Sequence, residues 1–315
     1  MIALQARANG ELSHRIGNPV EAALVSFGSG LIIISLISIF SPAIKSGMRN
    51  LKSAVTKKEI PVWTLFAGML GGSFVAVQTQ IVPIIGVAIY SVASIAGQTA
   101  ASLIVDRIGL TGGGKKHITV RRVAAAGVTV LAVLISVLDR IDAKNLSILA
   151  VIFGCFAGAI VGVQRALNGQ INESTHQSFA TSWLNFIMGT TFLVIFLTIG
   201  VLINRAEVVS LPAGPWWMYT GGTIGVIYIA FTSTIVQHVI YIAFTSTIVQ
   251  HLGVLTFTLI SVGGQLLGSL LIDLYSPTQG VQVSAYLVTG ILMTYLGVVV
   301  GGVGNLPKLK LAKRR

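Results

Sequence analysis

Amide side chains within apolar stretches are the groups of this chain best placed to do chemistry. Gln98 and Gln265 each lie eight residues before an aspartate, Asp106 and Asp273 respectively. Eight helical residues rise about 12 Å, so both amides are expected deep in an apolar layer, where polar side chains usually face the protein interior or a water-filled cavity. The pair could therefore hydrogen-bond a substrate. A structural role stays open, because glutamines also join membrane helices to one another.

Three more amides fit the same interpretation, and a fourth does not. Gln164 and Asn168 are four residues apart and share one face of a helix. We expect Gln164 to line a cavity with Asn185, which lies in another apolar stretch, and with Gln5, its equivalent in the repeat described below. Asn168 precedes Gly169, and this pair favours a helix end, because both residue types tolerate a left-handed backbone.

Other polar residues near the apolar stretches are expected to have structural roles. Asp106 is predicted to pair with its neighbour Arg107 at a membrane surface. Asp273 has no basic neighbour and is predicted to be an exposed anchor. Gln78 and Gln80 precede a proline turn and are predicted to lie at the membrane interface.

Neither catalysis nor cofactor binding is indicated. The histidines lack a convergent set of Asp and Glu residues of the kind that a catalytic site needs, so we expect no catalytic residues, no metal and no cofactor. Gly109, Gly114 and Lys115 match most of a phosphate-binding loop, but Lys116 stands where that loop needs a Ser or Thr. A lipid-acting membrane enzyme is therefore a weak alternative.

The elements that carry the amides are predicted to be membrane-spanning helices. Of the 315 residues, 54% are hydrophobic and 10% are charged, against roughly 25% charged residues in soluble domains. A spanning helix needs about 20 mostly apolar residues, and such long runs exceed an ordinary strand. The sequence thus predicts an all-α membrane protein with about nine spans. They are 20–43, 62–82, 84–105, 122–138, 146–167, 179–203, 216–236, 252–272 and 281–303.

Basic residues are distributed unequally between the segments that join these spans. With alternating crossings, sixteen of the 21 Lys and Arg residues fall on one face and five on the other. The positive-inside rule places the first face in the cytoplasm, together with the predicted loop 44–61 and the basic tail 306–315. Nucleic acid is excluded as an expected partner, because these loops contain no aromatic residues.

The second half of the chain repeats the first. Identical residues recur 159 positions later for Gln5, Asn9, Gly10, Phe27 and Gly30. The offset is 154 for Trp63, Gly68 and Gly71. It is 167 for Gly86, Gly97, Gln98, Ser102 and Asp106. We predict an inverted repeat of two five-helix halves, 1–140 and 145–305, because an odd number of spans reverses the second half. The first helix of the first half is expected to be largely missing, and about 15–20 upstream apolar residues would complete it.

A tandem duplication interrupts the second half. Residues 226–238 and 239–251 both read VIYIAFTSTIVQH, and this explains the change of offset from 154 to 167. A continuous helix from 216 to 251 would be about 54 Å long, against a hydrocarbon core of roughly 30 Å. We therefore expect one copy to leave the bundle as a bulge or an interfacial segment on the cytoplasmic side.

Two motifs that occur in both halves resemble those of a known family. Gln-x-x-x-Asn-Gly stands at 5–10 and 164–169, and Gly-Gln with an Asp eight residues after the Gln stands at 97–106 and 264–273. On these motifs the chain resembles the YdcZ-like family of the drug/metabolite transporter superfamily over nearly its whole length. The resemblance implies an inner-membrane transporter or exporter, without implying a particular substrate.

These observations together predict a secondary transporter. We expect it to export small metabolites or amphiphiles across the cytoplasmic membrane, with the substrate site at the interface of the two halves. The alternative is a membrane scaffold or subunit that transports nothing. The expected partners are an unidentified small-molecule substrate and the lipid bilayer, and a homodimer stays open.

The orientation can be tested by cysteine labelling. In a Cys155→Ser background, Ser53→Cys and Ala312→Cys should both resist a membrane-impermeant thiol reagent in intact cells and react after permeabilisation, because both positions are expected in the cytoplasm. Val208→Cys, in a segment expected on the opposite face, provides the positive control. Labelling of Ser53→Cys or Ala312→Cys in intact cells would contradict the orientation.

Overall fold

The chain is described here by a computed structural model that covers residues 1–110, 115, 117–138, 148–228, 249–276 and 282–303. Within these ranges the regular structure is helical, as the sequence predicted. The elements are α1 Ile2–Ile16, α2 Pro19–Phe40, α3 Pro42–Thr56, η1 Val62–Phe66, α4 Ala67–Ile108, α5 Val120–Ser136, α6 Ile148–Thr175, α7 Ser178–Leu202, η3 Trp216–Thr220, α9 Val249–Tyr275 and α10 Ala285–Val303. The tail 306–315 and most of the tandem copies lie outside the described residues.

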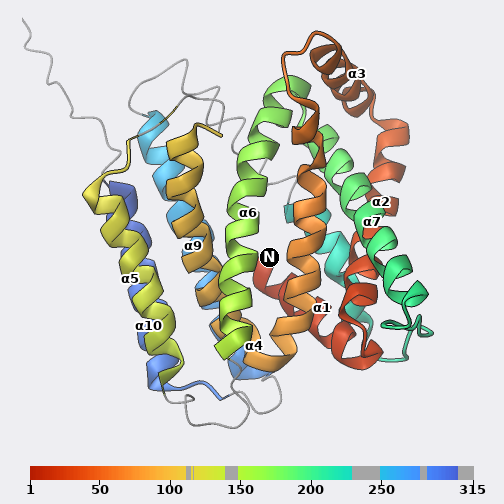
Figure 1. Cartoon of the computed structure of the whole chain (residues 1–315). Helices are drawn as coiled ribbons and strands as arrows, with labels where there is room; N and C mark the ends of the chain where they lie inside the picture. Colours follow the sequence, from red (N-terminus) through yellow and green to blue (C-terminus); the bar gives the residue numbers. More distant parts are fainter. Residues whose placement is uncertain (111–114, 116, 139–147, 229–248, 277–281, 304–315) are drawn as a thin grey trace, which may run out of the picture.

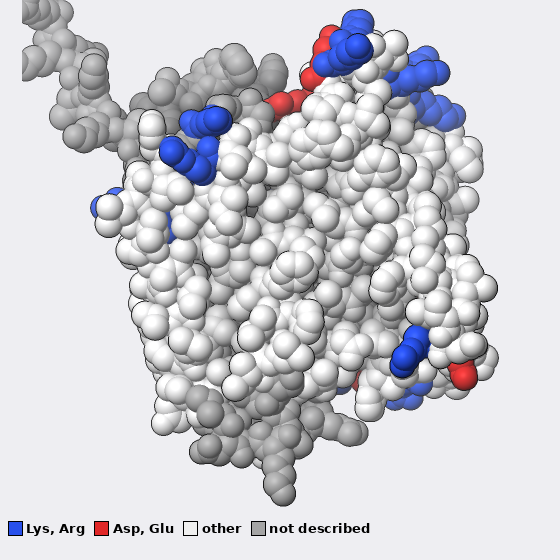
Figure 2. Space-filling model, viewed as in Figure 1, with Lys and Arg blue, Asp and Glu red and all other residues white. Residues whose placement is uncertain are grey.

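Four described helical stretches are long and apolar enough to cross a membrane by length and composition. They are Pro19–Phe40, Val62–Ile108, Ile148–Thr175 and Ser178–Leu202, and two shorter apolar helices are Val262–Tyr275 and Ala285–Val300. On the face shown in Figure 2, Lys and Arg side chains gather at the end of the bundle that carries α3, and an uncharged band separates them from the few charges at the other end. Such a band suits the hydrocarbon layer of a membrane.

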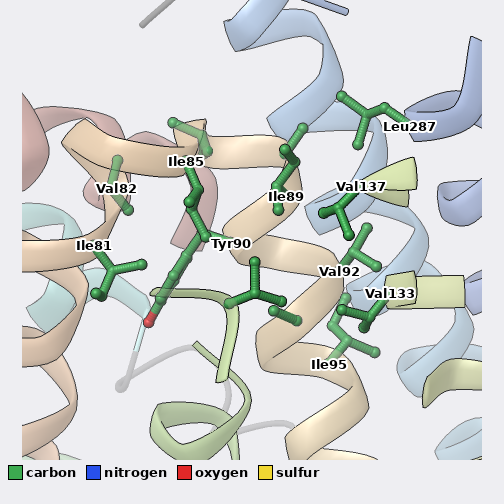
Figure 3. Packing of buried hydrophobic residues seen from close by; sticks show 14 of the residues in the cluster. Ile81, Val82, Ile85, Ile89, Tyr90, Val92, Ile95, Val133, Val137 and Leu287 are labelled. Carbon is green, nitrogen blue, oxygen red and sulfur yellow. The ribbon is translucent and has the colours of Figure 1, made fainter. Parts of the chain in front are cut away.

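Helix α4 lies at the centre of the bundle (Figure 1) and contacts α1, α2, α5, α6, α7, α9 and α10. Its residues Ile85 and Ile89 are fully buried in an apolar cluster. Val133 of α5 and Leu287 of α10 belong to the same cluster (Figure 3). The core therefore forms around α4, and each neighbouring helix is positioned by its contact with α4.

The chain reverses direction within α4, at Gly86. This residue has φ 81° and ψ 169°, a conformation that glycine adopts without steric cost. Pro83 precedes it and lacks the N–H that would continue the helical hydrogen bonds. The part of α4 before Gly86 and the part after it run in opposite directions (Figure 1). The predicted spans 62–82 and 84–105 are thus two arms of one broken element.

The prediction of a loop at 44–61 was wrong for its first part, which forms helix α3. Ser41 accepts a hydrogen bond from Ile44 N at 3.4 Å and so caps the helix. Ile44, Leu51 and Ala54 are buried, whereas the Lys and Arg residues between them are exposed. Apolar residues at helical spacing make this 15-residue helix amphipathic.

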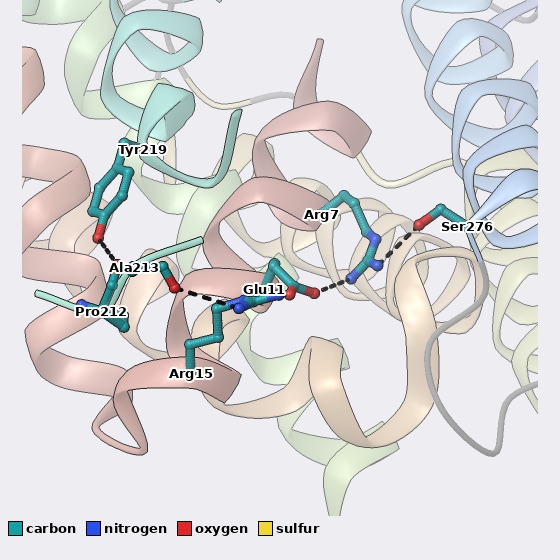
Figure 4. A network of polar contacts seen from close by, with 7 residues as sticks. All are labelled: Arg7, Glu11, Arg15, Pro212, Ala213, Tyr219 and Ser276. Atoms are coloured by element: carbon teal, nitrogen blue, oxygen red, sulfur yellow. Dashed lines mark hydrogen bonds and ion pairs between the residues drawn. The ribbon is translucent and has the colours of Figure 1, made fainter. Parts of the chain in front are cut away.

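A polar network fixes α1 to distant parts of the chain (Figure 4). Glu11 lies between Arg7 at 3.3 Å and Arg15 at 2.7 Å. Arg7 also donates to Ser276 Oγ at 3.0 Å, just after α9, and Arg15 donates to Ala213 O at 3.5 Å. By the offset of 159, α1 corresponds to 161–175, the C-terminal part of the 28-residue α6.

Asp273 caps the second arm of α4 from the other half of the chain. Val87 N donates to its Oδ1 at 3.2 Å and Ala88 N donates to its Oδ2 at 2.7 Å. Asp273 is only 2% exposed, so the predicted exposed anchor was wrong. The ion pair predicted for Asp106 also differs, since its partner is Arg122 at 2.6 Å rather than Arg107. In both cases the aspartate bonds to residues of another helix, and the prediction had considered only its neighbours in the sequence.

Removing the Asp273 carboxylate is expected to destabilise the fold. Asp273→Ala should lower the free energy of unfolding by about 1–3 kcal/mol, because two buried N–H groups lose their acceptor. Asp273→Asn should cost less, because its amide oxygen still accepts. The measurement is the denaturation midpoint of the purified protein in detergent micelles. Thr289→Ala is the control, because it removes only an exposed hydroxyl of α10 that donates to Ala285 O. Equal midpoints for Asp273→Ala and Thr289→Ala would contradict the role of the cap.

Candidate substrate site

The amides of the second half form a hydrogen-bonded network between α6 and α7. Gln164 Nε2 donates to Asn185 Oδ1 at 3.1 Å. Asn185 Nδ2 in turn donates to Asn168 Oδ1 and to Thr181 O, both at 2.8 Å. Asn185 is 1% exposed, and each polar atom of its side chain has a partner. The structure thus brings together Gln164 and Asn185, two of the residues that the sequence placed in a cavity.

Asn168 does not end its helix, contrary to the prediction. Helix α6 continues to Thr175, and the left-handed residue that follows it is His176, with φ 53°. The local Asn-Gly signal is overridden because the side chain of Asn168 accepts a hydrogen bond from Asn185 on α7. Asn168 therefore belongs to the network rather than to a cap.

The first half has a corresponding cluster with a different pairing. Asn9, the equivalent of Asn168, donates from Nδ2 to Gln78 Oε1 at 3.3 Å. Ser26 occupies the position of Asn185 and is 3% exposed. Asn9 Oδ1, Gln78 Nε2 and Ser26 Oγ are buried and have no hydrogen-bond partner among the residues that the structure describes. The first-half cluster therefore leaves Ser26 unpaired at the position where Asn185 of the second half has partners for both of its side-chain polar atoms.

Gln78 was missed as a member of this cluster. The sequence placed it at the interface with Gln80, but Gln78 is fully buried and only Gln80 is exposed. A signal was present, because Gly71, Val75 and Val82, all buried, stand with Gln78 at intervals of three or four residues. This spacing marks one face of α4 as buried.

Gln98 and Gln265 are not joined to each other among the described side chains. Gln98 Nε2 donates to Ser94 Oγ, one turn earlier on the same helix, at 3.1 Å, and its side chain is half-buried. Gln265 is 7% exposed. Gly97, next to Gln98, lies against Cys155 O of α6, so α4 and α6 approach closely at this level.

Helices α2 and α7 cross through a reciprocal pair of glycine and phenylalanine contacts. A Cβ added at Gly30 would overlap the Phe186 ring, and one added at Gly189 would overlap the Phe27 ring. The two rings lie 5.3 Å apart between centroids and are tilted by 53°. Gly30 is equivalent to Gly189, and Phe27 to Phe186. Each helix therefore contributes one glycine and one phenylalanine to the crossing.

The equivalent glutamines make a second reciprocal contact. Gln164 lies against Gly71 of the first half, where an added Cβ would overlap its Nε2. Gln5 lies against Gly225 of the second half, with its Nε2 at 2.9 Å from an added Cβ. The glycines are themselves equivalent at the offset of 154. Both glutamines thus lie where one half meets the other.

Asn185→Ala should destabilise the protein more than removal of an isolated buried hydroxyl. The variant leaves Gln164 Nε2 and Asn168 Oδ1 without a partner, and we expect a loss of about 3 kcal/mol in the free energy of unfolding. Ser182→Ala, in the same helix, removes a buried hydroxyl that donates to Ser178 O and should cost less than about 1 kcal/mol. Chemical denaturation of both variants makes the comparison, and equal losses would contradict the network.

A family comparison agrees with this organisation of the chain. The model of a family described as "Putative inner membrane exporter, YdcZ" matches residues 1–135, 149–239 and 236–300. No curated protein and no solved structure matches the chain. The match covers most of both halves and supports a transporter role in the inner, cytoplasmic membrane. The chain belongs to the YdcZ family of inner membrane exporters.

Proposed function

We propose that this protein is a secondary transporter that exports small metabolites or amphiphiles across the cytoplasmic membrane, with its substrate site between the two halves. The proposal rests on the reciprocal contacts that equivalent residues of the two halves make with each other's half. Gln164 lies against Gly71 as Gln5 lies against Gly225, and Gly30 meets Phe186 as Gly189 meets Phe27. Such reciprocity is expected where a pseudo-two-fold axis relates two halves.

An inverted repeat of two five-helix halves accounts for this reciprocity. An odd number of crossings turns the second half over, and transporters of this kind hold substrates near the bilayer midplane at the interface of the repeats. In this chain the first helix is largely missing and α1 corresponds only to its C-terminal part, which leaves about nine crossings. The end of the bundle that carries α3 and most basic residues then faces the cytoplasm, together with the C-terminal tail.

The amides at the interface are the proposed substrate contacts. Gln5, Gln164 and Asn185 lie where the halves meet or next to that place. Gln98 and Gln265 lie on arms of the two halves at equivalent depth. Amide groups both donate and accept hydrogen bonds, so they suit uncharged or weakly polar groups of a substrate better than they suit a fully charged one.

Flux into proteoliposomes tests the proposal. Purified protein reconstituted without ATP should give saturable uptake of at least one compound from a panel of labelled metabolites and fluorescent amphiphiles under an imposed ion gradient. Absence of flux for the whole panel, with correctly folded protein, would favour the scaffold alternative.

The glutamines provide the residue-level test. Gln98→Ala and Gln265→Ala should each reduce transport efficiency by about fivefold, because one hydrogen bond to the substrate is lost. Thr129→Val serves as the control, since it removes a buried hydroxyl that donates to Ala126 O where α5 packs on α10, on helices that carry neither glutamine. Wild-type transport by both glutamine variants at equal expression would refute their role as substrate contacts.

A further inference from the structure

Four uncharged side chains of the first half each have a buried polar atom without a hydrogen-bond partner in the described part of the chain. These atoms are Asn9 Oδ1, Ser26 Oγ, Gln78 Nε2 and the hydroxyl of Tyr90. The four residues are between 0% and 3% exposed. A buried donor or acceptor without a partner destabilises a fold, so each such atom requires an explanation, of which a functional role or a bound molecule is one.

The contacts between these residues make them one cluster. Asn9 and Gln78 are joined by a hydrogen bond of 3.3 Å. A Cβ added at Gly221 would meet both Asn9 Oδ1 and Ser26 Oγ, so these two atoms border the same point. The ring of Tyr90 lies against the ring of Phe74, which is one helical turn before Gln78 on α4, and among the described residues its hydroxyl has no hydrogen-bond partner. We name Asn9, Ser26, Gln78 and Tyr90 the open amide cluster.

The second half shows that the unpaired atoms are not a necessary feature of the fold. At the equivalent position of Ser26 it has Asn185, whose amide bonds both Gln164 and Asn168. Ser26 is too short to make both bonds, and so Asn9 Oδ1 keeps no donor. Similar backbone positions thus hold a closed network in one half and an open one in the other.

The free atoms define the kind of group that would complete the open amide cluster. Gln78 Nε2 offers N–H donors and Asn9 Oδ1 offers an acceptor, on either side of the bond that joins the two amides. A primary amide or a hydroxyl can accept from the first and donate to the second. None of the four side chains is charged at pH 7. A charged group would lose its hydration without gaining a counter-ion.

The surroundings of Tyr90 suit an apolar body attached to that group. Its ring lies 6.2 Å from the ring of Phe74 and belongs to the apolar cluster that includes Ile81 and Ile85 (Figure 3). In that view the hydroxyl points away from Ile85 and Ile89. An aromatic ring beside buried aliphatic residues favours contact with an aromatic or aliphatic ligand.

We propose that the open amide cluster is the subsite that binds the neutral, hydrogen-bonding head group of the substrate, an amide or a hydroxyl on an apolar body. This proposal rests on the proposed transport function, which it deepens by naming a substrate class. The structure then represents the protein with this subsite enclosed, because all four polar atoms are shielded from solvent.

Binding of four probes of equal size tests the substrate class. The full chain in lipid nanodiscs should bind radiolabelled benzamide, and benzyl alcohol should compete with it. Benzoate and benzylammonium at the same concentration should not compete, because each carries a charge at pH 7. Failure of benzamide to bind, or equal competition by a charged probe, overturns the proposal.

Two variants separate a ligand site from a structural cluster. Tyr90→Phe removes only the unpaired hydroxyl, and it should weaken benzamide binding about fivefold while leaving the thermal midpoint equal or higher. Ser26→Asn copies the residue of the second half, and it should raise the midpoint and weaken binding by supplying a donor to Asn9 Oδ1. Thr129→Val is the matched control and should retain wild-type affinity. A lower midpoint with unchanged affinity for Tyr90→Phe would overturn the proposal.

Flux measurements distinguish a failure of this substrate-class proposal from a failure of the proposed transport function. If charged compounds are transported and neutral ones are not, the protein is a transporter and the open amide cluster is not its substrate subsite. If nothing is transported but benzamide binds in a Tyr90-dependent manner, the subsite stands and the transport proposal fails.

Discussion

The arrangement of the bundle depends on the break in α4 at Gly86 and on the carboxylate that caps the new helix. A helix that restarts in an apolar environment presents N–H groups that water cannot reach, and these groups must be bonded within the protein. Asp273 supplies both oxygens to Val87 and Ala88, and its negative charge also suits the helix N-terminus. A residue 186 positions away thus fixes the start of the second arm. Because α4 contacts seven other helices, the position of this arm affects most of the core.

Close approach of helix backbones supplies much of the remaining cohesion. In lipid, apolar surfaces gain little by association, so helices are held by van der Waals contact and hydrogen bonds, and small residues permit that contact. Gly97 lies against Cys155 O, and Gly158 lies against Ser94 O, so α4 and α6 interlock in both directions. The crossing of α2 and α7 uses rings instead, with each phenylalanine placed over a glycine of the other helix.

The two halves share these contacts but differ in how their amides are bonded. A network such as Gln164–Asn185–Asn168 adds rigidity, because both side-chain polar atoms of its central, buried Asn185 have partners. The first half replaces Asn185 with Ser26 and pairs Asn9 with Gln78 of α4 instead. In the transport function proposed above, the second half would act as a rigid support and the first half would offer unpaired groups to the substrate. This asymmetry is consistent with a duplicated transporter whose halves have diverged in role.

The sequence by itself determined the membrane class, the helical character and the equivalence of residues such as Gln5 and Gln164. Composition and repeated identities are properties of the chain alone, and they need no knowledge of contacts. The sequence also singled out Gln164 and Asn185, because amides are rare in apolar stretches. Only the tertiary structure decided that Asp273 is a buried cap, that Gln78 joins Asn9 and that Asn168 continues its helix. Burial and hydrogen-bond partners depend on which helix faces meet, and the partners here are separated by up to 186 residues, beyond the reach of any local pattern.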